Sequence, residues 1–242
     1  MYSEDIAIEN FIDFCDYMQI DEYEIAVEMD KNPFKTIFDK FVEFVKWIWE
    51  KITKLFKKNK LDINAIYEES KEKEGDSKLV AYVPNLEIGN KYRTIYKRYI
   101  EYLKKWFNIK DRFIQTEDND NKEFEDQIIK DSKLLIEDFN NIKDTVNELS
   151  KDKSFSNYDN GVEFMPLSNF QKFNNNIFED CKNIKGLCDE FSKDKLVKTF
   201  ARFSSISNTF IRSTETALSS LTSLLVLTNR IIIYSRAVNN KK

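Results

Sequence analysis

The residues most suited to chemistry in this chain are the carboxylates and amides of one short acidic tract. The tract reads Glu117-Asp118-Asn119-Asp120-Asn121-Lys122-Glu123. Alternating carboxylate and amide oxygens are typical of a calcium-binding loop, which also needs a glycine at its sixth position and a glutamate at its twelfth. Counted from Asp118 as the first position, those two positions are Glu123 and Ile129 in this chain, so neither requirement is met. We therefore expect the tract to be a solvated acidic loop between helices.

The chain contains no histidine, and this absence removes most familiar catalytic and metal-binding arrangements. It excludes Ser-His-Asp and Cys-His nucleophiles and the H-E-x-x-H zinc helix. No P-loop, G-x-S-x-G or G-x-G-x-x-G pattern occurs. Neighbouring carboxylates such as Glu179 and Asp180 point in different directions on a helix and make a poor acid–base pair. We predict a non-enzymatic protein without cofactor or metal, although lysine, tyrosine and carboxylates could still catalyse a reaction if a polar cleft gathered them.

The three cysteines, Cys15, Cys181 and Cys188, do not indicate a disulfide framework, because their number is odd. Cys181 and Cys188 are seven residues apart, which places them about 10 Å from each other on one helix face, too far to bridge. We expect buried apolar thiols, with a redox or metal role as the less favoured alternative.

Two basic segments rich in aromatic residues are the stronger functional candidates, since cations beside aromatic rings can contact phosphates, bases or an anionic surface. The first covers residues 33–58 and the second residues 91–107. The candidate contacts with an anionic partner are Lys35, Lys46, Lys51, Lys54, Lys57, Lys58, Lys91, Arg93, Lys97, Arg98, Lys104 and Lys105. The first segment also fits an interfacial membrane helix or a helix that packs on a protein partner. A core helix with a solvated charged rim is the plainer explanation of both segments.

The charges of the chain are arranged in alternating blocks. Residues 1–30 contain ten acids and no Lys or Arg, whereas residues 31–60 contain nine Lys and three acids. The acidic block also predicts a short amphipathic helix that ends before Asp21, with Ile8, Phe11, Ile12, Cys15 and either Tyr17 or Met18 on its apolar face. Such blocks favour pairing with each other or with separate charged partners.

Only four glycines and three prolines interrupt the 242 residues, and this scarcity favours long helices over strand-rich or nucleotide-binding α/β folds. We predict an all-α protein, a helical bundle of about five to seven helices with heptad-like seams and a long C-terminal helix. The seams fall in residues 122–150 and 168–200. The predicted organisation is an acidic N-terminal segment (1–30), a basic amphipathic helix region (31–75), a linker (76–90) and a helical bundle (91–242).

Local signals place several elements. Asn32 and Pro33 predict the start of a helix that continues to about residue 58. A second helix is expected over residues 92–113 and a loop over residues 150–166. Residues 196–238 predict one helix or two, and their small serines and threonines favour the most buried position in the bundle.

The sequence contains no signal for secretion or for a membrane span. The acidic N-terminus has the wrong charge for a signal peptide. The longest uncharged run, residues 216–229, has fourteen residues, fewer than the roughly 20 that a spanning helix needs. We therefore expect neither secretion by a signal peptide nor a transmembrane helix.

The layout of about the first 60 residues, of which residues 9–60 read ENFIDFCDYMQIDEYEIAVEMDKNPFKTIFDKFVEFVKWIWEKITKLFKKNK, resembles the start of internal or structural virion proteins of large tailed bacteriophages. The resemblance implies a location in a virion or the bacterial cytoplasm. In those proteins a short acidic helix precedes a helix rich in Lys, Trp and Phe. The resemblance implies an acidic leader that a prohead protease removes after a glutamate, with Glu22, Glu24 and Glu28 as candidate processing sites. An acidic helix that folds back permanently on residues 31–60 is the alternative.

The expected function is therefore that of a structural or assembly protein, a head-internal phage virion component whose basic helices contact an anionic partner. Its expected partners are other proteins, through the capsid or self-association, and DNA, but no small-molecule substrate. The alternative is a membrane-active helical protein, similar to a toxin or lysis factor, that inserts its amphipathic helices into a bilayer.

Overall fold

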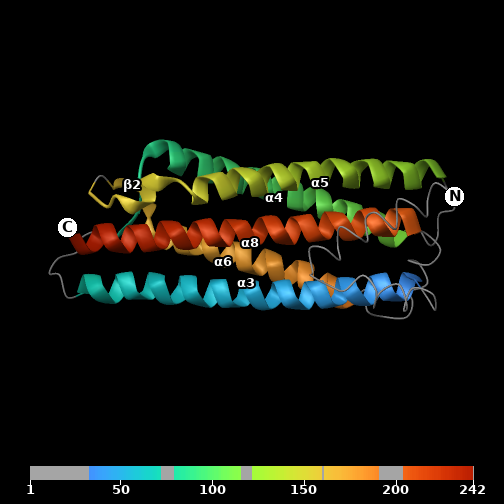
Figure 1. The fold of residues 1–242 in the computed structure, drawn as a ribbon, viewed down its shortest axis with the longest axis horizontal. Coiled ribbons are helices and arrows are strands. Elements are labelled where there is room, and N and C mark those ends of the chain that lie inside the picture. The colour runs from blue at the N-terminus through green and yellow to red at the C-terminus, as the bar shows by residue number, and fades with distance from the viewer. Residues whose placement is uncertain (1–32, 72–78, 116–121, 160, 191–203, 242) are drawn as a thin grey trace.

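A computed structural model describes residues 33–71, 79–115, 122–159, 161–190 and 204–241, and five long α-helices account for most of them. The helices run along one common axis (Figure 1). They are α3 (Pro33–Lys71), α4 (Leu86–Gln115), α5 (Lys122–Ser150), α6 (Leu167–Glu190) and α8 (Ser204–Lys241). The predicted all-α bundle with a long C-terminal helix is thus confirmed.

Helix α8 is the central element of the bundle. It packs against each of the other four long helices and against the first strand. Five of its described serines and threonines are buried, namely Ser213, Thr214, Ser220, Thr228 and Ser235, whereas Ser219, Thr222 and Ser223 are partly exposed. Several donate their hydroxyl hydrogen to the α8 backbone, as Thr228 Oγ1 does to the Leu224 carbonyl at 2.7 Å. Ser220 Oγ also lies 2.7 Å from the Phe139 carbonyl oxygen of α5. Small side chains therefore let neighbouring backbones approach this helix closely.

The predicted heptad seam of α5 is confirmed. Its repeating apolar residues are all buried, and α5 packs on α8: Ile128, Leu135, Phe139, Ile142, Val146 and Leu149. In α6 the residues Ile177, Cys181 and Ile184 are likewise fully buried. The part of the second predicted seam that follows Glu190 lies outside the described residues.

Two short strands and a turn of 3₁₀-helix correct the sequence prediction. The predicted linker 76–90 contains β1 (Val80–Val83) and the first turn of α4, and the predicted loop 150–166 contains η2 (Lys153–Ser156) and β2 (Val162–Pro166). The strands pair antiparallel with an irregularity between Ala81 and Tyr82. They are only four and five residues long, and their pairing crosses two helices in the sequence, so no local pattern indicated them.

Helix α3 begins at Pro33 as predicted but continues to Lys71, well beyond residue 58. Buried Ile63 and Ile66 extend its apolar face, and Arg236 of α8 holds the Glu69 carboxylate in a hydrogen-bonded ion pair. Because α3 packs along α8 and α6, the 31–75 region and the 91–242 region form one bundle.

The side chain of Ser235 attaches the small sheet to the central helix. Its Oγ accepts a hydrogen bond from the Tyr82 N–H at 2.7 Å and lies 2.7 Å from the Ile231 carbonyl oxygen. Ser235→Ala removes the Ser235 Oγ acceptor from the buried Tyr82 N–H, so we expect the free energy of unfolding to fall by about 1–3 kcal/mol. Urea denaturation measures this change, with partly exposed Ser219→Ala as the control that shifts it by less than about 0.5 kcal/mol.

The predicted acidic N-terminal helix, the candidate processing sites Glu22, Glu24 and Glu28, and the acidic residues 117–120 lie outside the described residues.

Candidate functional site

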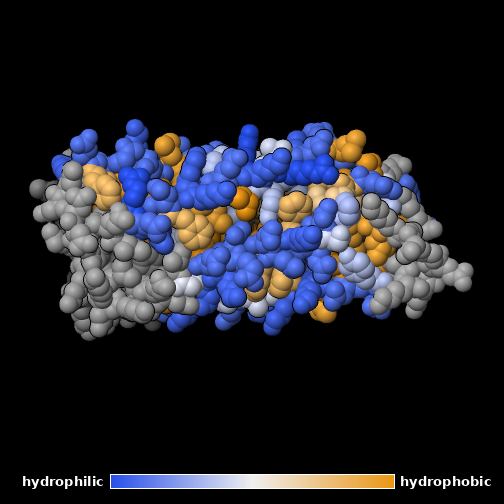
Figure 2. All heavy atoms as spheres, turned by 180° about the vertical axis from the view of Figure 1, so that it is seen from behind, coloured by the Kyte–Doolittle hydropathy of each residue, from blue (hydrophilic) through white to orange (hydrophobic). Residues whose placement is uncertain are grey.

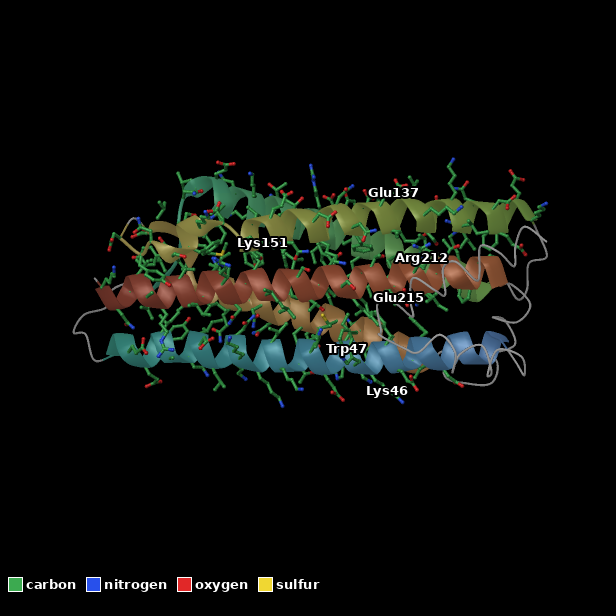
Figure 3. All side chains as sticks on the ribbon, viewed as in Figure 1. Lys46, Trp47, Glu137, Lys151, Arg212 and Glu215 are labelled. Atoms are coloured by element: carbon green, nitrogen blue, oxygen red, sulfur yellow. The ribbon has the colours of Figure 1, made fainter. Side chains whose placement is uncertain are left out.

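The predicted lysines of α3 form one exposed surface, which we call the α3 basic face. Its members are Lys46, Lys51, Lys54, Lys57, Lys58 and the additional Lys60, and all six are exposed. At about 100° of rotation per residue they share roughly one half of the helix circumference. Lys46 lies on the outer edge of α3 (Figure 3). The side chain of Lys35 lies outside the described residues.

The cations of the α3 basic face are not neutralised by nearby carboxylates. Glu50 is the single acid between positions 46 and 60. Within the described part of the chain, Lys46, Lys54, Lys57 and Lys58 form no ion pair. The ammonium of Lys51 lies 3.8 Å from the ring centroid of Trp47, a cation–π contact. The face therefore combines six positive charges along about 21 Å of rigid helix.

The opposite side of α3 fixes the direction in which these lysines point. Phe44, Ile48 and Ile52 are buried in the core. The buried amide of Asn59 donates to Asn174 Oδ1 of α6 at 2.9 Å and to the Leu225 carbonyl of α8 at 3.3 Å. These contacts set the rotation of α3 about its axis and so keep the lysines outside.

The predicted cations of α4 have more varied roles. Lys91 pairs with Glu87 at 2.7 Å, and this hydrogen bond and charge raise the pKa of Lys91. Arg93 donates to the Phe164 carbonyl at 2.5 Å and stacks on the Phe164 ring, so it fastens β2 to α4. Lys105 lies over the ring of Tyr102. Lys97 and Lys104 are exposed and form no ion pair within the described residues.

A polar groove of about 590 Å³ separates α4 from α5, and two of the predicted cations line it. Lys91 and Arg98 stand on the α4 side, but Glu87 and Asp138 line the same groove. Because the groove contains both signs of charge, it has no net preference for an anion. Helices α3 and α4 lie on opposite sides of the bundle (Figure 1), so the predicted cations form two separate surfaces.

The face over α4 and α6 is mostly hydrophilic, with separate apolar patches among the polar residues (Figure 2). Beneath it, burial raises the pKa of the Cys181 thiol and, with a smaller contribution from Glu179, raises the pKa of Asp180 to about 6. A thiol held in its protonated form is a poor nucleophile and metal ligand. Among the described residues, no three His, Cys, Asp or Glu side chains gather as metal ligands.

One helix has the length and apolar composition to cross a membrane, namely residues Thr209–Lys241 of α8. The sequence predicted no spanning helix, because Glu215 and Arg230 limit the longest uncharged run to residues 216–229. In the bundle, 61% of the most apolar window of this helix is buried, and the core helix of any bundle meets the same criterion.

Comparison of the chain with protein families, curated proteins and solved structures gives no match. The sequence pattern alone did not distinguish the lysines of α3 and α4 that form no ion pair within the described residues from Arg93, which fastens β2 to α4. That difference depends on the Phe164 carbonyl and other partners from distant segments, which no local pattern indicates.

Proposed function

We propose that this chain is a non-enzymatic structural or assembly protein whose α3 basic face binds a polyanionic partner. The observation that supports the proposal best is the row of unpaired, exposed lysines on one rigid helix. Cations on a fixed support neutralise successive phosphates and release their counterions, which favours binding without sequence preference. The resemblance of the first 60 residues to internal virion proteins favours the phage head, with packaged DNA as the polyanion.

The proposal predicts salt-sensitive binding to a short duplex DNA of arbitrary sequence. In the quadruple variant Lys46→Glu, Lys54→Glu, Lys57→Glu and Lys58→Glu, we expect the affinity at low salt to fall at least tenfold. The slope of log K against log salt should also become shallower by about 0.9 for each phosphate that the variant no longer neutralises. Fluorescence anisotropy over a salt series measures both quantities.

A matched quadruple variant separates this surface from net charge. Lys122, Lys130, Lys133 and Lys151 are exposed lysines on and just after α5, and their change to Glu alters the total charge by the same amount. We expect this control to retain most of the affinity. Equal losses in the two quadruple variants, or wild-type binding by the α3 variant, would contradict the proposal.

A membrane surface is the second candidate, because two exposed apolar side chains lie on α3 beside the lysines of the α3 basic face. Trp47 is 37% exposed and Leu61 is 69% exposed, which suits an interfacial helix. Flotation with vesicles of phosphatidylserine and phosphatidylcholine distinguishes this candidate. Binding that survives high salt and disappears in Leu61→Asp supports a membrane role, whereas no flotation at any salt concentration removes it.

A further inference from the structure

Between α3 and α5, one strip of the central helix α8 is not covered by any of the other described helices. Both flanking helices pack on α8, and the strip lies between them on the face turned to the viewer in Figure 1. The strip, which we call the α8 strip, consists of partly or fully exposed residues: Arg212, Glu215, Ser219, Thr222, Ser223, Val226 and Ile233. Val226 and Ile233 are each 43% exposed, which is unusual for apolar residues of the core helix.

A groove of about 160 Å³ occupies the middle of this strip. Trp47 and Lys51 of α3 form one wall, and Lys143 of α5 stands on the other, with Val226 on the floor. No acidic residue lines the groove, and neither lysine forms an ion pair within the described residues. An occupant that fits must offer apolar side chains to Trp47 and Val226 and carboxylates to the two lysines.

We infer that the chain's own acidic segment, residues 1–30, docks in this groove. The segment contains ten acids and no Lys or Arg, so it complements two cationic walls. Ile8, Phe11, Ile12 and Cys15 recur at helical spacing and supply an apolar face. Asp13 and Asp16 are three residues apart and so lie on the same side of this apolar face, where they can reach the lysine of one wall. Ser219, Thr222 and Ser223 of the strip have small side chains, so a helix that docks there can pack close to α8.

The chain connection allows this placement. Trp47 lies about 21 Å along α3 from Pro33, at about 1.5 Å per residue. The predicted acidic helix ends before Asp21, and the twelve residues from Asp21 to Asn32 can span up to about 40 Å when extended. That length is enough for the chain to turn back and run antiparallel to α3.

Docking would also place acids beside the α3 basic face, since Lys51 belongs both to that face and to the groove. The acidic segment would then compete with an external polyanion. This consequence rests on the proposed function, but the docking itself does not.

Disulfide trapping in the full chain tests the docking directly. Cys15 lies on the predicted apolar face of the segment, so Val226→Cys or Ser223→Cys introduces a partner in the groove. In a Cys188→Ser background, mild oxidation should form an intrachain disulfide with Cys15 in at least one of the two variants. Peptide mapping by mass spectrometry identifies the linked pair. Lys97→Cys, exposed on α4 on the other side of the bundle, is the matched control and should not link.

Charge-reversal variants test the docking of the acidic segment independently. Lys51→Glu with Lys143→Glu should lower the yield of the trapped disulfide at least fivefold, and adding Asp13→Lys with Asp16→Lys should restore it. Lys130→Glu with Lys133→Glu, away from the groove, should leave the yield unchanged. The inference is overturned if neither groove cysteine links, if the Lys97→Cys control links equally well, or if only interchain dimers form. DNA binding is measured separately, in the wild type and in the variant Asp13→Lys with Asp16→Lys, whose acidic segment competes less, so its absence from both would refute the proposed function without affecting this result.

Discussion

Phe210→Ala is expected to lower the free energy of unfolding by about 3–5 kcal/mol, the largest effect that we expect of any single substitution in this bundle. Phe210 is completely buried in the N-terminal half of α8. Its ring lies parallel to that of Phe113, with centroids 4.7 Å apart, and stacks on Trp106 at 5.6 Å. Both partners belong to α4, so the substitution opens a cavity in the interface between α4 and the central helix.

Ile233→Ala on the same helix is the control, because its side chain is 43% exposed and leaves little cavity. We expect the free energy of unfolding to fall by less than about 1 kcal/mol there. Urea denaturation of both variants, followed by circular dichroism, gives the comparison. A double-mutant cycle with Phe113→Ala should show a coupling of about 0.5–1.5 kcal/mol. A decrease at Phe210 no greater than that at Ile233 would show that this aromatic cluster does not stabilise the bundle.

The sequence predicted the parts of the fold that depend on periodicity. The repeat of Leu135, Ile142 and Leu149 indicated the buried seam of α5, because a helix that packs lengthwise on another repeats its contacts every three to four residues. The central position of α8 followed from its length and small polar residues, since a helix surrounded by others has no room for a charged face.

The sequence could not predict features that depend on contacts between distant segments. Strand β1 forms only because Val80 and Ala81 meet Pro166 and Met165, more than 80 residues away. The extension of α3 beyond residue 58 is likewise stabilised by Arg236 of α8. Among the candidate site residues, the charge pattern placed the lysines of α3, which are exposed, in the same class as Arg93, which binds the Phe164 carbonyl.

The burial of Glu215 leads us to expect a second large effect, a decrease in the free energy of unfolding as pH rises. One carboxyl oxygen, Oε1, is buried without a hydrogen-bond partner. Burial raises the pKa of Glu215 from 4.5 to about 8, and the charge of Arg212 opposes this shift only in part. Between pH 4.5 and 8 the folded protein therefore keeps a proton that the unfolded chain has released. The free energy of unfolding should decrease through this window by up to about 1.4 kcal/mol per pH unit and level off above pH 8.

Glu215→Gln keeps the shape of the side chain and removes the titration. At pH 4.5 and below, the variant and the wild type should have similar free energies of unfolding, and above pH 6 the variant should become progressively more stable. The slope is an upper limit, because the residue as a whole is partly exposed. Glu137→Gln, an exposed carboxylate of α5 labelled with Glu215 in Figure 3, is the control and should leave the pH dependence unchanged. Since Glu215 lies on the α8 strip, parallel curves for wild type and Glu215→Gln would mean that its carboxylate remains hydrated in the groove region and ionises without cost to the fold.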